Sequence, residues 1–407
     1  MTQTLPITAA TDPDRPFRRK VFYIPGYDPI HPRRYRELYR KEGADQAKLS
    51  GYTLALQPKK TKGPYGWHVT TDTAEAEVEV LVWSDIVRSS MQQGILATYL
   101  QLIRTAWTYV ASGALFRLMR LRKGPMIAAL YPIGMLLLQL ALALAAGFAL
   151  YRLGALLHPA LGVVAAVATT TLILRTFRAQ DNRLYAYYLM HDYAFTARHN
   201  GANPPELEAR MATFRATIAA ALTEDLDEVL VVGHSSGAHL AVSILADLIR
   251  QDLPATRPAL GFLSLGQVVP MISFLPKANR LRADLHYLAA RRELSWVDVS
   301  APGDGCAFAL CDPVAVTGVP PEDKLWPLVI SAAFSQTLSP DRWKSLRWRF
   351  FRLHFQYLCA FDALSGGGGD YDYFQITAGP ITLQERYENR APSKSRIETP
   401  RSGCRSL

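Results

Sequence analysis

Short apolar runs alternate with helix-like segments over most of the 407 residues. Runs such as Val78–Trp83 and Val229–Val232 are apolar almost throughout, which is typical of strands buried on both faces of a sheet. Their alternation with helices predicts an α/β fold built on a doubly wound, mostly parallel sheet. The strands are expected at Val21–Ile24, Tyr52–Leu56, Val78–Trp83, Val229–Val232, Leu260–Leu265 and Ser295–Val299.

The stretch from Gly124 to Leu174 departs from this pattern, because Arg152 is its only charged residue. At about 20 residues per crossing, it is long enough for two transmembrane helices. We expect a helical hairpin with its turn near Arg152–Pro159, inserted between the strand at Val78–Trp83 and the helix before Val229–Val232. A buried core hairpin or a hydrophobic lid is the alternative interpretation.

The net charge of +10 is concentrated beside this apolar stretch. Basic residues before and after it outnumber the single arginine in its turn, so the positive-inside rule places both ends of the hairpin, and both termini, in the cytoplasm. No nucleic-acid-reading motif accompanies the charge, so nucleic acid is not an expected partner. The flanking basic residues are Arg104, Arg117, Arg120, Arg122, Lys123, Arg175, Arg178 and Arg183.

Three further segments have distinctive composition. Residues 1–20 and 385–407 are rich in Pro, Ser and Arg and are predicted to be flexible tails, and the first contains no signal-peptide core. Ser89–Leu121 mixes apolar and basic residues and is interpreted either as a helix on the membrane surface or as an ordinary amphipathic helix. The four cysteines lack disulfide-framework or zinc-site spacing, which favours a reducing compartment and no metal.

The segment that begins at Glu228 carries the clearest chemical signal. Gly233, Ser235 and Gly237 have Gly-x-Ser-x-Gly spacing between an apolar strand and a helix-like run. Such a nucleophile elbow holds a serine in a strained turn, and glycines two positions away let the strand and helix approach. At a helix N-terminus the backbone dipoles favour a developing oxyanion.

On these residues the chain resembles the α/β-hydrolase superfamily, of the serine lipase and esterase type. The resemblance implies that Ser235 is a nucleophile and that the acid and histidine follow it in chain order. Three histidines follow Ser235: His239, His286 and His354. His239 is expected to pack within the elbow helix and to point away from the nucleophile, and His286 precedes every suitable acid, so His354 is the predicted base.

The acid is expected just beyond a late strand. Asp304 follows the run Ser295–Val299 in the sequence Ala-Pro-Gly-Asp-Gly-Cys and is the predicted triad acid. Asp298, inside the strand, and Asp312, before Pro313, remain alternatives, because an aspartate between two glycines is often only a turn former.

An oxyanion hole needs two backbone donors. The resemblance places one at Ser236, after the nucleophile, and the other at Tyr27, in the early loop Ile24-Pro-Gly-Tyr-Asp. An ordinary Pro-Gly turn is the alternative for that loop. The glycine run Gly366–Gly369, with Tyr371, Tyr373 and Phe374 at its end, is interpreted either as a flap over an acyl chain or as a linker.

Together these features predict a membrane-anchored serine hydrolase that acts on a lipid-like or acylated ester, with no cofactor. Residues 21–123 and 175–384 form the hydrolase domain and residues 124–174 the transmembrane hairpin. The expected partners are the lipid bilayer and the ester substrate. An acyltransferase with the same triad, or a catalytically silent membrane scaffold of the same fold, are the alternative functions.

Overall fold

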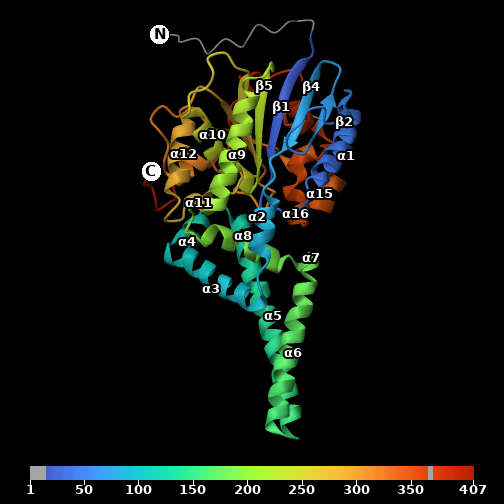
Figure 1. Ribbon diagram of the computed structural model, residues 1–407, viewed down its shortest axis with the longest axis vertical. Helices are drawn as coiled ribbons and strands as arrows, with labels where there is room; N and C mark the ends of the chain where they lie inside the picture. The colour runs from blue at the N-terminus through green and yellow to red at the C-terminus, as the bar shows by residue number, and fades with distance from the viewer. Residues whose placement is uncertain (1–14, 365–369) are drawn as a thin grey trace.

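The computed structural model describes residues 15–364 and 370–407. Its centre is an eight-stranded sheet in the order β2-β3-β4-β1-β5-β6-β7-β8 (Figure 1). Neighbouring strands from β4 through β1 to β8 are parallel, whereas β2, β3 and β4 pair antiparallel. The predicted α/β class with a mostly parallel sheet is therefore confirmed. The strands are β1 (Phe17–Ile24), β2 (Ala55–Pro58), β3 (Gly66–Thr70), β4 (Ala74–Val80), β5 (Glu228–His234), β6 (Ala259–Leu265), β7 (Ser295–Ser300) and β8 (Leu328–Ser331).

Helices cover both faces of the sheet, because its central strands are apolar on both sides. In β5, Val229 and Val231 belong to one apolar core while Leu230 and Val232 belong to the other. The first core is covered by α9 (Pro205–Ala221), α10 (Ser236–Ile249) and α12 (Asn279–Ala289). The second is covered by α1 (Arg33–Ser50), α17 (Tyr373–Ala378) and α18 (Leu383–Tyr387).

Seven consecutive helices separate β4 from α9, and several short helices follow β6. The first group is α2 (Ser84–Met91), α3 (Ile95–Ala111), α4 (Ala114–Leu118), α5 (Lys123–Ala155), α6 (Pro159–Ala179), α7 (Asp181–Leu184) and α8 (Ala186–Ala197). The second is α11 (Val269–Ser273), α13 (Pro313–Thr317), α14 (Phe334–Thr337), α15 (Pro340–Leu346), α16 (Phe350–His354) and the 3₁₀ helix η1 (Gln356–Leu358).

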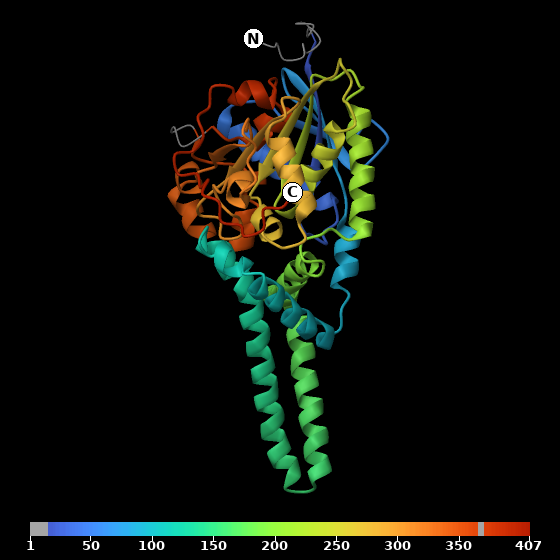
Figure 2. The ribbon, with the colours of Figure 1, turned by 90° about the vertical axis from the view of Figure 1, so that its left-hand side faces the viewer.

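The helices α5 and α6 run antiparallel and project from the end of the sheet where its parallel strands finish (Figures 1 and 2). Both are long and apolar enough to cross a membrane. Their connection, Leu156–His158, lies within the region predicted for the turn. The part of α5 up to Leu136 belongs to the domain, since Leu136 packs with residues of α3 and α8. Below that point α5 is about 29 Å long at 1.5 Å per residue, close to the thickness of a bilayer core.

Small residues let the two long helices approach closely. A Cβ added at Gly147 would lie 2.4 Å from Thr170 Oγ1, and one added at Gly154 would lie 2.9 Å from Gly162 Cα. In apolar surroundings such contacts are a main source of helix association, because water is not there to drive it. The residues facing outward, such as Leu144, Phe148 and Val167, are apolar and exposed.

The C-terminal residues, predicted to be a flexible tail, lie against the domain instead. Ser393 N–H donates to the Val329 carbonyl at 2.8 Å, Ile397 bridges to Cys311, and Arg282 Nε donates to the Ser406 carbonyl at 2.8 Å. These contacts, two between backbone groups and one from the Arg282 side chain, hold the segment against the domain, which its polar composition does not indicate. At the other end, β1 already begins at Phe17, so the predicted N-terminal tail was too long; residues 1–14 lie outside the described part of the chain.

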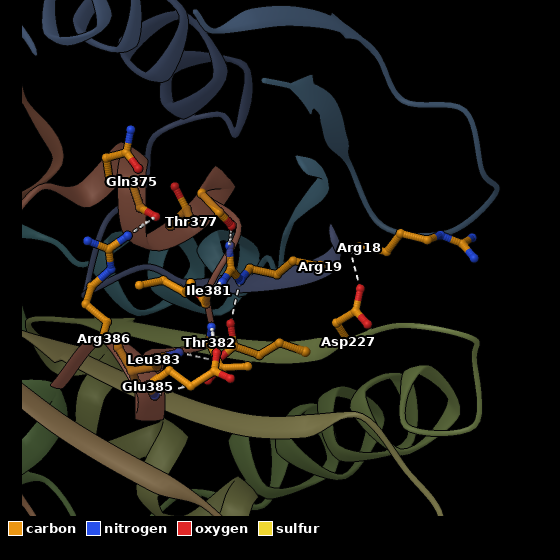
Figure 3. A network of polar contacts seen from close by, with 12 residues as sticks. Arg18, Arg19, Asp227, Gln375, Thr377, Ile381, Thr382, Leu383, Glu385 and Arg386 are labelled. Carbon is orange, nitrogen blue, oxygen red and sulfur yellow. Dashed lines mark hydrogen bonds and ion pairs between the residues drawn. The ribbon is translucent and has the colours of Figure 1, made fainter. Parts of the chain in front are cut away.

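A buried polar network fastens the C-terminal region to the start of β1 and β5 (Figure 3). Arg19 Nε pairs with Glu228 Oε2 at 2.5 Å, and its other nitrogens donate to the carbonyls of Gly379 and Ile381. The Leu383 N–H donates to Glu228 Oε1 at 2.7 Å. Every one of these groups is satisfied within the protein, and the network lies at the opposite end of the strands from α5 and α6. We therefore assign it a structural role.

Candidate active site

Ser235 occupies a strained turn between β5 and α10. Its backbone angles are φ 55° and ψ −121°, a backbone conformation that residues other than glycine rarely adopt. A Cβ at Gly233 would lie 2.7 Å from Ala238 Cα, and one at Gly237 would lie 2.1 Å from the Ile24 carbonyl oxygen. Both glycines of the motif are therefore required by backbone packing, and the turn has the geometry predicted for a nucleophile elbow.

The predicted acid and base are in direct contact. His354 Nδ1 lies 2.7 Å from Asp304 Oδ2, and both residues are buried. Asp304 Oδ2 also accepts from the Tyr357 hydroxyl at 3.0 Å, and Asp304 Oδ1 accepts from the Cys306 N–H at 2.9 Å. Because a carboxylate only accepts, His354 carries its proton on Nδ1 and leaves the Nε2 lone pair available. Among the described residues Nε2 has no hydrogen-bond partner.

The alternative acids have other partners. Asp298 accepts from the Ser264 hydroxyl at 2.6 Å inside the sheet, and burial raises its pKa to about 8. Asp312 caps α13 through the N–H groups of Val314 and Ala315 and pairs with Lys324 at 2.7 Å. Neither carboxyl is bonded to a histidine, so the structure brings only Asp304 to His354.

The other two histidines that follow Ser235, His286 and His239, are not bonded to the predicted acid. His286, on α12, contacts the Val319 carbonyl at 3.0 Å and takes no part in the site. His239 differs from the expectation: it lines a small cavity together with Tyr27 and Ser236 and does not simply pack within its helix. Burial lowers the pKa of His239 to about 4, so it is neutral near pH 7.

Ser235 and His354 both lie against the end of β6. Ser235 N–H donates to the Leu265 carbonyl at 2.9 Å, and a Cβ added to the next residue, Gly266, would lie 3.1 Å from His354 Cε1. No hydrogen bond joins Ser235 Oγ to His354 Nε2 in this structure. In enzymes without bound substrate such bonds are often long and tighten on binding.

The two predicted oxyanion donors lie at one cavity. Tyr27 and Ser236 both line it, and neither backbone N–H donates to another backbone group within the described residues. Gly26 brings the early loop against the nucleophile, since a Cβ there would lie 2.9 Å from Ser235 Cβ. The cavity holds about 20 Å³, enough for one water molecule, so an ester would have to open it.

Two neighbours of the site, His234 beside Ser235 in the motif and Asp192 on α8, are not among the predicted site residues. His234 Nε2 donates to the His354 carbonyl at 3.0 Å, which leaves its Nδ1 to accept from the Tyr23 hydroxyl at 3.3 Å. Burial lowers the pKa of His234 to about 3, so it stays neutral. Asp192, on α8, lines the cavity; burial raises its pKa to about 7 while the nearby His354 lowers it.

Asp304, Cys306 and His354 could also be considered as metal ligands, since one ligand atom of each lies within 4.8 Å of the others. Two facts argue against that use. His354 Nδ1 and Asp304 Oδ2 are already bonded to each other, and burial raises the pKa of the Cys306 thiol, which disfavours the thiolate that binds metals. The group fits a hydrogen-bonded acid and base better than a metal centre.

The acid loop touches the start of α5. A Cβ added at Gly124 would lie 3.0 Å from Gly305 Cα, and Arg122 Nε donates to the Ala309 carbonyl at 2.8 Å. On the histidine side, the rings of Phe351 and Tyr185 are 4.8 Å apart, which joins α16 to α8. The helices that lead into and out of the long helical pair therefore support both residues.

The glycine run Gly366–Gly369, interpreted as a flap or a linker, lies within residues 365–369, outside the described part of the chain. The aromatic residues after it do not face the cavity. Tyr371, Tyr373 and Phe374 are buried in the second core, and the Tyr371 hydroxyl donates to the Tyr357 carbonyl at 2.7 Å. They anchor the end of the segment instead of covering substrate.

Ser235, His354 and Asp304 thus follow β5, β8 and β7 at the carboxyl edge of the sheet, where α/β proteins commonly bind ligands. Comparison with known proteins adds no family to this geometry: no protein-family model, no curated protein and no solved structure matches the chain.

Proposed function

We propose that the protein is a serine hydrolase of the α/β-hydrolase type that cleaves a carboxylic ester through Ser235, His354 and Asp304. The observation that carries this proposal is the buried Asp304–His354 pair, whose Nε2 has no partner among the described residues, at the same strand end as Ser235 in its strained φ 55° turn. Ser-His-Asp triads recur on unrelated folds and are recognised by the geometry and roles of their residues.

In the proposed reaction His354 Nε2 accepts the Ser235 hydroxyl proton as Oγ attacks the ester carbonyl. Asp304, fixed by the Tyr357 hydroxyl and the Cys306 N–H, holds the ring and stabilises the imidazolium. The N–H groups of Tyr27 and Ser236 stabilise the oxyanion. His354 then protonates the leaving alcohol, and water attacks the acyl-enzyme to release the acid.

A lipid-like or acylated ester is the substrate class that the architecture favours. The carboxyl edge of the sheet faces the end of the molecule from which α5 and α6 project (Figure 2). We propose that these two helices cross the membrane, with the domain and both termini in the cytoplasm. The basic residues at the domain end of the pair, including Lys123, Arg175 and Arg178, support this orientation.

Two other functions use the same structure. An acyltransferase would pass the acyl group from Ser235 to an alcohol in place of water, and nothing in the triad distinguishes the acceptors. A silent scaffold would keep the fold without turnover. The strained Ser235 conformation favours an enzyme over a scaffold, because strain of this kind costs about 1–3 kcal/mol and persists where function needs it.

Ester turnover by full-length protein in membranes tests the proposal. Wild type, Ser235→Ala and Ser236→Ala are compared on long-chain acyl esters, with and without added alcohol. Ser235→Ala should abolish turnover, whereas Ser236→Ala should retain it because the Ser236 backbone N–H is unchanged. Product ester formed from the added alcohol would indicate acyl transfer, and equal turnover by wild type and Ser235→Ala would refute both reactions.

A further inference from the structure

The helix α3 presents an apolar face that no other part of the described chain covers. Residues at helical spacing, i, i+4, i+7, i+11 and i+14, are exposed along it, with 74% of Leu96, 64% of Ile103 and 71% of Trp107 accessible. The opposite face packs on the domain, where Leu102 and Tyr109 are buried. A continuous apolar face of five exposed side chains marks an interaction surface. The exposed residues are Leu96, Leu100, Ile103, Trp107 and Val110.

This face lies beside the long helical pair. Figures 1 and 2 show α3 crossing the domain end of α5 and α6. The Tyr99 hydroxyl donates to the Leu136 carbonyl of α5 at 3.0 Å, and the start of α3 at Gly94 lines an open pocket with Arg175 and Arg178 of α6. The start of α3 is therefore level with the arginines that end the second apolar helix.

The contacts between α5 and α6 show which residues of α5 lie opposite Arg175 and Arg178. Thr170 Oγ1 donates to the Ala143 carbonyl at 3.3 Å, so the next turns of α6 lie opposite the part of α5 near Leu137. From Leu137 towards the turn, both helices carry no charged residue before Arg152. In the other direction, α5 packs into the domain core at Leu136. A bilayer around the pair would thus have its headgroups at the start of α3.

We propose that the exposed face of α3 lies in the cytoplasmic interface of the bilayer, and that the pocket formed by Gly94, Arg175 and Arg178 takes an anionic lipid headgroup. An aromatic residue and aliphatic side chains on one face, with arginines beside it, suit the boundary between headgroups and acyl chains.

This contact has a consequence for the site. The buried face of α3 packs on α8, which carries Asp192 and lines the cavity beside Ser236. A second contact in addition to α5 and α6 would fix the tilt of the domain and hold the carboxyl edge of the sheet near the lipid surface. The inference rests on the proposed membrane crossing, but it does not depend on the proposed reaction.

Photo-crosslinking in the full-length protein tests the inference. A benzophenone amino acid is placed at Ile103 on α3, at Val167 in α6 as a positive control, and at exposed Thr213 on α9 as a negative control. The protein is reconstituted in vesicles of 30% phosphatidylglycerol and 70% phosphatidylcholine, and adducts are identified by mass spectrometry. We expect lipid adducts at Ile103 and Val167 and none at Thr213.

The outcomes separate the two proposals. Lipid adducts at Val167 without any at Ile103, or adducts of Ile103 to a second protein chain, would overturn the inference on α3. Absence of lipid adducts at Val167 would overturn the membrane crossing itself. Phosphatidylglycerol should make up at least twice its 30% share of the Ile103 adducts, and Arg175→Gln/Arg178→Gln should remove the excess; an unchanged share would overturn the headgroup pocket.

Discussion

At the scale of single residues, the site depends on one carboxylate that is held by three donors. Asp304 accepts from His354 Nδ1, the Tyr357 hydroxyl and the Cys306 N–H, so it can fix the tautomer of the histidine ring. Asp304→Asn places an amide against Nδ1 and favours the wrong tautomer. We expect kcat to fall by about 10³–10⁴ with little change in KM, as measured by ester turnover.

Asp298→Asn is the matched control, because Asp298 is as deeply buried as Asp304 but bonds Ser264. Its pKa of about 8 means that the carboxyl is largely protonated near pH 7, so a neutral amide of the same shape should change turnover less than about threefold. If Asp298→Asn were the damaging change, the acid would be misassigned.

His234 is expected to position His354, the proposed catalytic base, through the His354 backbone carbonyl. His234→Phe leaves the buried His354 carbonyl without its donor, which costs about 1–3 kcal/mol and lets the histidine loop shift. We expect turnover to fall about tenfold or more, whereas His234→Gln, which retains an N–H donor, should recover much of it. Equal losses in both variants would show that ring packing matters instead of the hydrogen bond.

Asp192 makes stability depend on pH in a defined direction. Its pKa is about 7 in the folded chain against an ordinary value of 3.8, so the folded state binds more protons between these values. The contribution of Asp192 to the free energy of unfolding is therefore fully present below pH 3.8 and is lost as pH rises through about 7. Asp192→Asn should therefore raise the melting temperature over wild type by about 2–5 °C at pH 8.5 and by less at pH 5.5, measured by thermal unfolding in detergent. A gain that does not grow with pH would contradict this.

At the scale of elements, the contact between α5 and α6 is set by glycines. Gly147→Ile would force a side chain into Thr170 and Ala166, and such overpacking costs about 1–3 kcal/mol. We expect a lower melting temperature in detergent. Gly134→Ile, in the same helix, is the control, because a Cβ there meets no atom within 4 Å. Equal effects of both changes would show that helix propensity alone is responsible.

Helices and strands with a strong apolar pattern could be predicted from the sequence. Segments that are ordered by pairing with distant parts of the chain could not. The buried strands β5, β6 and β7 and the two long helices follow from continuous apolar runs. The apolar pattern does not indicate β3, which lies between β2 and β4, or the four-residue edge strand β8, because short strands gain their order from the neighbours they pair with. The C-terminal segment is held by long-range hydrogen bonds, which its composition does not encode.

The same distinction holds within the site. Ser235 is recognisable because its turn needs glycines at fixed local spacing. Asp304 and His354 are indicated by their order in the chain after Ser235 and, for Asp304, by its position in a loop after a strand. Asp192 becomes a neighbour of the site only through tertiary packing, so no local pattern indicates it. His234 precedes Ser235 in the motif, but its contact with His354 depends on tertiary packing. The expectation for His239 is wrong because the first turn of its helix, although mostly buried, lines the cavity with Ser236 and His239.

At the scale of the whole molecule, two apolar helices with exposed outer faces predict a firmly bound membrane protein. We expect the full chain to stay with the membrane fraction in carbonate and in high salt, since burial of apolar surface does not depend on ionic strength. Tags at both termini should resist external protease in intact cells. Release by salt alone would show a peripheral protein, and cleavage of either tag would contradict the proposed orientation.

The central claim is that Ser235 is an activated nucleophile, and covalent labelling tests it most directly. Full-length protein in membranes is treated with a fluorophosphonate probe, and the adduct is located by mass spectrometry in wild type, Ser235→Ala and Ser236→Ala. The account predicts one adduct, on Ser235, that is lost in Ser235→Ala and kept in Ser236→Ala. Absence of labelling in the wild type, or labelling that persists in Ser235→Ala, would contradict it.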